Sequence, residues 1–197
     1  MSSLSPALVG QEMGHVYALD HSRAGGVEYR DSWDVMSNRG PFMTPHPVYT
    51  ELDGNGQPIW RIGPGLNAAN MQGRGRLDTS RVWQAGATES DRVVDLRPLR
   101  SRGLAGYLCA RVGPYVFEFR VKQEWDAAIS QACVLVHEFN GNQSVLLPTT
   151  NGHQDLRAGD EFLRGHPASA TGTLVRVKAL SIDVGTRTAR LSVTRRP

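Results

Sequence analysis

The sequence predicts a mainly β protein, in which a small α-helical and irregular N-terminal part precedes an antiparallel, jelly-roll-like β-sandwich. Three observations indicate this fold class. Runs that alternate apolar and polar residues, as half-buried strands do, are confined to the chain after about residue 80. The 21 glycines and 11 prolines exceed what a helical bundle needs. Only a short stretch near the start has helical spacing.

We expect two parts, residues 1–78 and residues 79–197. The second part contains strand-like runs separated by short turns without a helical pattern between them, which favours antiparallel pairing. Cys109 and Cys133 lie in two of these runs and form either one inter-strand disulfide or two buried thiols. The runs are 92–96, 105–112, 115–121, 132–137, 174–182 and 188–193.

The first part begins with a short predicted helix. Ser5 is suited to the N-cap and Pro6 to the first helical position. After the glycine pair at 25–26, roughly fifty residues rich in Gly, Pro, Asn and Asp follow. So long an irregular stretch indicates either a function or a missing scaffold. The apolar positions with near-helical spacing are Leu8, Val9, Met13, Val16 and Tyr17.

Composition excludes several classes of partner. The net charge is +3, and the arginines are interleaved with acidic residues instead of forming a basic face with aromatic platforms, so we expect no nucleic acid. No run approaches ~18 apolar residues, so we expect no membrane-spanning helix. The first residues lack a signal peptide, so the chain is cytoplasmic or has lost its targeting segment, and its localisation stays undetermined.

The candidate chemistry lies on the predicted helix and just beyond it. Gln11 and His15 are four residues apart and therefore share one helical face, and His21 follows beyond a turn. In zinc hydrolases two side chains at this spacing bind the metal and a third histidine completes the site. The acid after the first ligand, here Glu12, takes the proton of the metal-bound water.

This motif resembles the HExxHxxGxxH signature of the metzincin metallopeptidases, here in the form QExxHxxAxxH. Residues 28–37, which contain Met36, resemble the Met-turn of the gametolysin and immune-inhibitor-A families. Residues 65–70 are similar to the helix after that turn, and the β-rich part is similar to the sandwich that follows such peptidases. The resemblance implies a zinc-helix and Met-turn remnant in residues 1–78, with zinc or copper held by Gln11, His15 and His21.

Three departures from the family pattern matter. Gln11 stands where the first histidine ligand belongs, and an amide oxygen is the weaker zinc ligand. Ala18 replaces a glycine where the helix ends, and a left-handed conformation there costs roughly 1 kcal/mol. Only ten residues precede Gln11, so we expect the N-terminal sheet of the family, with its substrate-binding edge strand, to be absent from this chain.

Each candidate also has a structural interpretation. The two histidines could be ordinary polar contacts, Glu12 a solvated helix residue, and Met36 plain core packing. His46, which lies between two prolines, could replace a lost ligand.

We therefore expect a metzincin-like metallopeptidase relative that binds a divalent metal and has weak or no peptidase activity; the sequence does not decide whether it is an active enzyme. The alternative is a non-catalytic binding or interaction module derived from a secreted metallopeptidase. A third, weaker interpretation is a metal enzyme of another reaction class. We expect a peptide or protein as substrate or partner, and a second copy or a partner protein covering the apolar face of the first helix.

Overall fold

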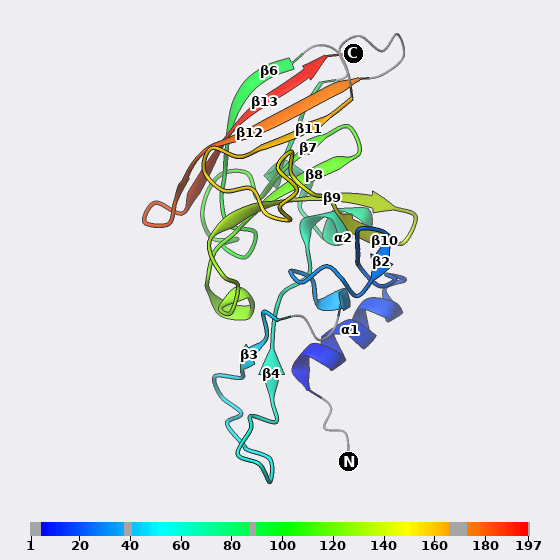
Figure 1. The fold of residues 1–197 in the computed structure, drawn as a ribbon, viewed down its shortest axis with the longest axis vertical. Coiled ribbons are helices and arrows are strands. Elements are labelled where there is room, and N and C mark those ends of the chain that lie inside the picture. Colours follow the sequence, from blue (N-terminus) through cyan, green and yellow to red (C-terminus); the bar gives the residue numbers. More distant parts are fainter. Residues whose placement is uncertain (1–4, 38–40, 87–89, 166–172, 197) are drawn as a thin grey trace.

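The computed structural model describes residues 5–37, 41–86, 90–165 and 173–196 of the chain. Two β-sheets lie one above the other, and the N-terminal segment lies beneath the larger sheet (Figure 1). The larger sheet has the order β2-β1-β10-β9-β8-β7-β5 and the smaller has the order β11-β12-β13-β6. Pairing is antiparallel except for two short parallel pairs, β1 with β10 and β5 with β7. The prediction of a mainly β chain with antiparallel sheets is confirmed.

The strands of the larger sheet are β1 (Arg23–Ala24), β2 (Val27–Glu28), β5 (Val82–Gln84), β7 (Cys109–Val112), β8 (Tyr115–Arg120), β9 (Cys133–Asn140) and β10 (Gln143–Leu146). Those of the smaller sheet are β6 (Ser90–Leu96), β11 (Glu161–Arg164), β12 (Leu174–Asp183) and β13 (Thr188–Arg196). A separate pair joins β3 (Thr44–Pro45) to β4 (Arg61–Ile62). The helices are α1 (Pro6–Val16), α2 (Ala68–Gly73) and the 3₁₀ turns η1 (Val35–Ser37), η2 (Thr79–Arg81) and η3 (Glu124–Asp126).

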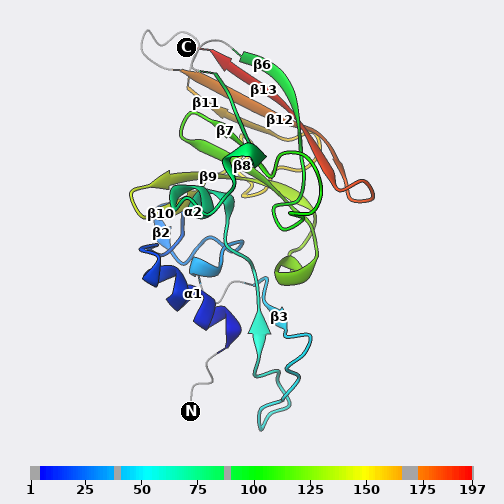
Figure 2. The same ribbon diagram turned by 180° about the vertical axis from the view of Figure 1, so that it is seen from behind.

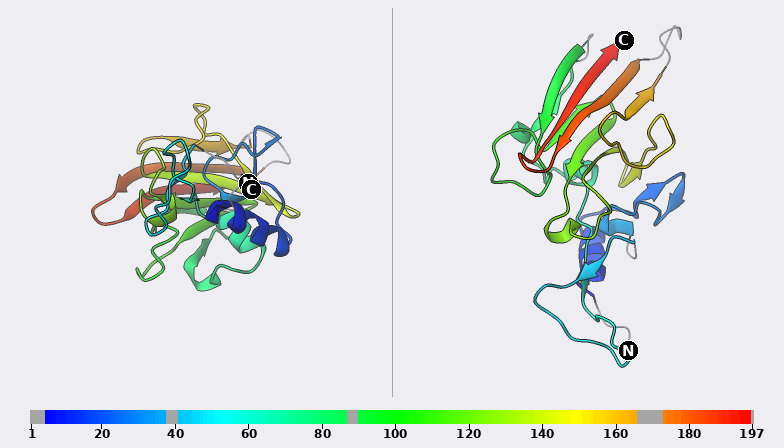
Figure 3. Two further views of the ribbon diagram at one scale, coloured as in Figure 1. Left: turned by 90° about the horizontal axis from the view of Figure 1, so that it is seen from below. Right: turned by 60° about the vertical axis from the view of Figure 1, so that its left-hand side comes forward.

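The two sheets pack face to face around an apolar core, as the view from another side makes clear (Figure 3). Phe117 and Phe119 enter this core from the larger sheet, and Val177 and Leu191 enter it from the smaller sheet. Along β12, buried residues alternate with exposed ones, so the outer face of the smaller sheet is open to water. The alternation that predicted these strands is therefore the alternation between core and solvent.

The other face of the larger sheet is covered by the N-terminal part of the chain. α2 lies across it, with Ala68, Ala69 and Met71 against Cys109 and Val116 (Figure 2). α1 lies farther out, beneath η1 (Figure 1). None of the helices in the described ranges is long and apolar enough to cross a membrane.

All six predicted runs contain a strand, although the run at 105–112 is a strand only from Cys109 onward. The sequence did not predict β5, β10 and β11, which are short, or the β1–β2 hairpin. Because β1 pairs with β10, the larger sheet takes strands from both sides of the predicted boundary at residue 78. Both cysteines are buried and free, which favours the two-thiol alternative.

Candidate metal site

α1 begins and ends as its sequence requires. The Ser5 hydroxyl accepts a hydrogen bond from the Leu8 amide at 3.3 Å, and Pro6 occupies the first turn. The helix ends at Val16, and Ala18 takes the left-handed conformation expected of it, with φ 58°. This reversal brings the Leu19 carbonyl back to the side chain of His15.

The two candidate histidines lie next to each other. Their ring centroids are 4.8 Å apart, with the rings nearly perpendicular. Nδ1 of His15 lies 2.8 Å from the Leu19 carbonyl oxygen. A carbonyl only accepts hydrogen bonds, so Nδ1 carries the proton and the lone pair of His15 is on Nε2. Metal-binding histidines are oriented by such a bond from the second ring nitrogen to a carbonyl or carboxylate.

Gln11 is buried and lies one turn before His15. Its side-chain oxygen Oε1 is shielded from solvent and has no hydrogen-bond partner. A buried acceptor without a partner costs about 1–3 kcal/mol. Glu12 is exposed to solvent. The candidate donors are thus two imidazole nitrogens and one amide oxygen.

Of the three candidate ligands, only His15 and His21 belong to the residue types that usually bind metals. Within the described ranges, no cluster of three or more His, Cys, Asp or Glu residues could hold a metal ion. His46, the alternative ligand, instead accepts hydrogen bonds at Nδ1 from the amides of Val48 and Tyr49, both at 3.0 Å.

The structure adds neighbours of His21 that the motif did not identify. Nδ1 of His21 lies 3.5 Å from a Glu28 carboxylate oxygen and 3.8 Å from one of Asp20. Nε2 lies 2.7 Å from the hydroxyl of Tyr29. The Gly25-Gly26 pair could have revealed them. Both glycines have positive φ and form the two-residue loop of the β1–β2 hairpin, which returns the chain beside His21.

Met36 packs directly against α1. A Cβ atom on Gly14 would come within 2.2 Å of the Met36 sulfur, so any larger residue at that position of the helix requires the Met36 side chain to shift. Met36 is fully buried, and its amide donates a 2.7 Å hydrogen bond to Asp34 Oδ1. Its carbonyl accepts from the amide of Ser22, the residue after His21. The turn carrying Met36 thus supports both the helix and the segment after it.

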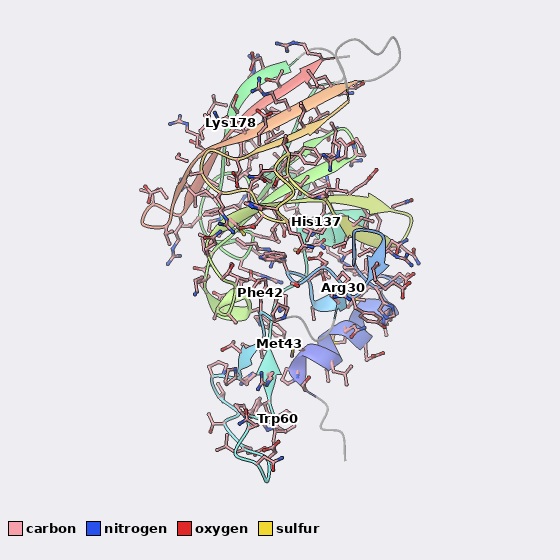
Figure 4. All side chains as sticks on the ribbon, viewed as in Figure 1. Arg30, Phe42, Met43, Trp60, His137 and Lys178 are labelled. Atoms are coloured by element: carbon pink, nitrogen blue, oxygen red, sulfur yellow. The ribbon has the colours of Figure 1, made fainter. Side chains whose placement is uncertain are left out.

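A buried polar network holds this turn to the larger sheet. Asp31 lies 2.9 Å from Nε2 of His137 on β9, the residue labelled where the N-terminal segment meets the sheet (Figure 4). Asp34 accepts hydrogen bonds from the Asn67 amide and the Asn70 side chain at the start of α2. Sequence reasoning placed the two aspartates in the Met-turn-like stretch and the two asparagines in the stretch after it, but assigned them no role, because contacts between buried polar side chains have no periodic pattern.

Two groups of this network, the Asp34 carboxyl and the His137 imidazole, have shifted pKa values. Burial, with the nearby Asp31 carboxylate adding to it, raises the pKa of Asp34 to about 6. Burial opposes the charged form of His137, but the Asp31 carboxylate outweighs it and raises the pKa of that imidazole above its ordinary value.

The side of α1 away from the histidines is not covered by the described part of the chain. Val9, Met13, Val16 and Tyr17 are exposed there, Val16 by 83%. A cavity of about 250 Å³ opens beside them, between the helix and Leu66, with Trp125 on its wall.

Comparisons with known proteins give one match. A family model described as gametolysin peptidase M11 matches residues 4–170 of the chain. This range includes α1, the turn with Met36, α2 and the strands up to β11. No curated protein and no solved structure matched.

Proposed function

The chain belongs to the gametolysin family of metallopeptidases, and from this premise we propose that it binds zinc or copper through His15, His21 and Gln11, with weak or no peptidase activity. The observation that carries the proposal is the pair of neighbouring imidazoles of His15 and His21, whose centroids are 4.8 Å apart, together with the buried, unpartnered oxygen of Gln11 one turn earlier on α1. Imidazole suits both zinc and copper.

The role of each residue follows from its chemistry and place. His15 and His21 supply nitrogen donors, and Gln11 supplies an amide oxygen from the preceding turn of α1. A bound divalent ion would supply Lewis-acid activation of a water molecule. We assign Glu12, exposed and next to Gln11, to accept the proton of that water. Met36 packs against the helix from the side of the larger sheet and fixes its position.

Two features favour weak catalysis. Protein zinc sites are built from Cys, His, Asp and Glu, and a neutral amide is not among these ligands. Glu12 has no hydrogen bond or ion pair with another described residue, so nothing in the described chain holds its carboxylate in one place. A general base acts efficiently only within hydrogen-bond reach of the proton it removes.

Metal affinity tests the proposal most directly. We expect Gln11→His to lower the Kd for Zn²⁺ at least tenfold, measured by competition with a chromophoric chelator. Gln11→Leu, of similar volume but without a donor atom, should raise it. An unchanged Kd in both variants would show that residue 11 is not a ligand. Peptide cleavage at a high rate, abolished by Glu12→Ala, would contradict the proposal of weak activity.

The second candidate function is a non-catalytic binding module, and the uncovered face of α1 favours it. We infer that a second copy of the chain or a partner protein covers this face, since burying each large apolar side chain contributes about 1.5–3 kcal/mol. Light scattering at micromolar concentration should show a dimer or larger assembly. Val16→Glu should dissociate it, whereas Val93→Glu, at an exposed site on β6, should not. A wild-type monomer under these conditions would exclude a second copy as the cover of this face and leave a partner protein as the alternative.

A further inference from the structure

The phenol of Tyr29 touches the candidate metal site, and neither the histidine motif nor the family match assigns it a role. We propose that Tyr29 regulates metal affinity: its hydroxyl occupies the lone pair of His21 Nε2 in the metal-free chain and leaves it when a divalent metal binds. This inference rests on the proposed function, because it concerns the same imidazole.

The surroundings of His21 decide which ring nitrogen has the lone pair. Nδ1 faces two carboxylates, Glu28 at 3.5 Å and Asp20 at 3.8 Å. Carboxylates accept hydrogen bonds, so they favour the tautomer with the proton on Nδ1. Nε2 is then the acceptor, and the Tyr29 hydroxyl, 2.7 Å away, is the donor.

The same lone pair would have to bind the metal. Zinc lies about 2.0–2.1 Å from a histidine nitrogen, along its lone pair. The Tyr29 oxygen also lies on this lone pair, 2.7 Å from the nitrogen. A metal ion bound to Nε2 would therefore overlap with the hydroxyl. The two states exclude each other, and the hydroxyl has to move before His21 can act as a ligand. His15 Nε2 has no such competitor within the described chain.

The fold holds Tyr29 in this place at a cost. The β1–β2 hairpin returns the chain antiparallel to Arg23–Ala24, and the Tyr29 amide donates to the Ser22 carbonyl at 3.0 Å. Tyr29 has φ 60°, a left-handed conformation that is uncommon for a bulky residue. Its ring lies against the His21 ring, with centroids 4.1 Å apart. Strained backbone of this kind collects at functional sites.

Tyr29→Phe tests the inference, because it removes the hydroxyl and keeps the ring contact. A hydrogen bond of this kind shifts an equilibrium by about two- to tenfold. We therefore expect the variant to bind Zn²⁺ about two- to tenfold more tightly than the wild type, and to bind Co²⁺ with the same gain, read from the visible absorption of the bound ion. Tyr107→Phe, on a part-exposed tyrosine of the loop before β7, is the matched control and should leave both values unchanged.

The outcomes separate this inference from the proposed function. Equal affinity in wild type and Tyr29→Phe, with binding still sensitive to Gln11→His, would overturn the role of Tyr29 and leave the metal site in place. Weaker binding in Tyr29→Phe would also overturn it, because the phenol would then be a ligand. Absence of Zn²⁺ and Co²⁺ binding in wild type, Tyr29→Phe and Gln11→His alike would overturn both.

Discussion

The two faces of the larger sheet are buried by different chemistry. Toward the smaller sheet the contact is apolar, with Phe117 and Phe119 among aliphatic side chains. Toward the N-terminal part, charged groups are buried as well: Arg120 lies 2.8 Å from Glu118 and 2.6 Å from Asp126, all almost fully shielded from solvent. An apolar interface tolerates volume-conserving substitutions with repacking, whereas the removal of one partner from a buried charge pair costs several kcal/mol.

The buried charged cluster of Glu118, Arg120 and Asp126 connects directly to the segments that carry the candidate site. Asp126 accepts from the amide of Gly65, and Glu118 accepts from the amide of Ala68 at the start of α2. α2 in turn holds Asp34, whose carboxylate supports Met36 in the turn that packs against α1. The comparison therefore teaches that the sandwich supplies stability, while the position of the candidate site depends on a chain of buried hydrogen bonds.

The largest expected effect comes from breaking the charged cluster. Arg120→Met leaves Glu118 and Asp126 buried without a cation and should lower the free energy of unfolding by about 3–5 kcal/mol in urea titrations. The matched control is Arg176→Met, which removes an exposed pair with Glu161 on the outer face of the smaller sheet. That variant should cost less than about 1 kcal/mol. Similar losses in both would contradict the distinction between the two faces.

The pH dependence of stability should come from the buried polar network that contains Asp34 and His137. Asp34 has its pKa raised from 3.8 to about 6, so its contribution is complete below pH 3.8 and is lost as the pH rises through about 6. His137, with a raised pKa, contributes fully below pH 6.5 and loses that contribution as the pH rises further.

Both shifts act in the same direction. The free energy of unfolding should therefore fall between about pH 4 and pH 8, by an amount on the order of 2–3 kcal/mol. Urea unfolding across this range measures it. In His137→Gln the part of the decrease above pH 6.5 should disappear. Stability that rises over this range would show that the Asp34 carboxylate is favoured by its three hydrogen bonds more than burial disfavours it.

The same contrast explains what the sequence could predict. The strands β12 and β13 were predictable because one side of each meets the core and residues alternate accordingly. The residues of β8 alternate in sequence as well, but its polar residues Glu118 and Arg120 are buried on the other face of the sheet. Gln11 and His15 were identified by their spacing on α1, and His21 by its distance beyond the turn that ends this helix. His137 and Tyr29 were not, since their roles arise from contacts made 106 and 8 residues away, respectively, with Asp31 and His21. Pairing of this kind has no local pattern.

A smaller effect should distinguish two glycines of α1. Gly14→Ala places a Cβ 2.2 Å from the Met36 sulfur, and should destabilise the chain by about 1–3 kcal/mol despite the higher helix propensity of alanine. Gly10→Ala meets only a Val35 methyl at 3.3 Å and should be near neutral or stabilising by up to about 1 kcal/mol. Thermal unfolding of the two variants measures this difference in stability. Equal midpoints would mean that the Met36 side chain moves aside at no cost.

The smallest effect should come from the N-cap of α1, which lies outside the buried polar network. Ser5→Ala removes one 3.3 Å bond to the Leu8 amide at a part-exposed end of α1, and should cost about 0.5–1 kcal/mol. Asn67→Ala removes the equivalent cap of α2, but Asn67 is fully buried and also donates to the Ser144 hydroxyl at 2.7 Å, so the loss of this second buried hydrogen bond adds its own cost. We expect at least twice the loss of unfolding free energy for Asn67→Ala. If the two losses were equal, the Asn67 side chain would act only as a cap, and the buried network would not fix the position of α2 against the sheet.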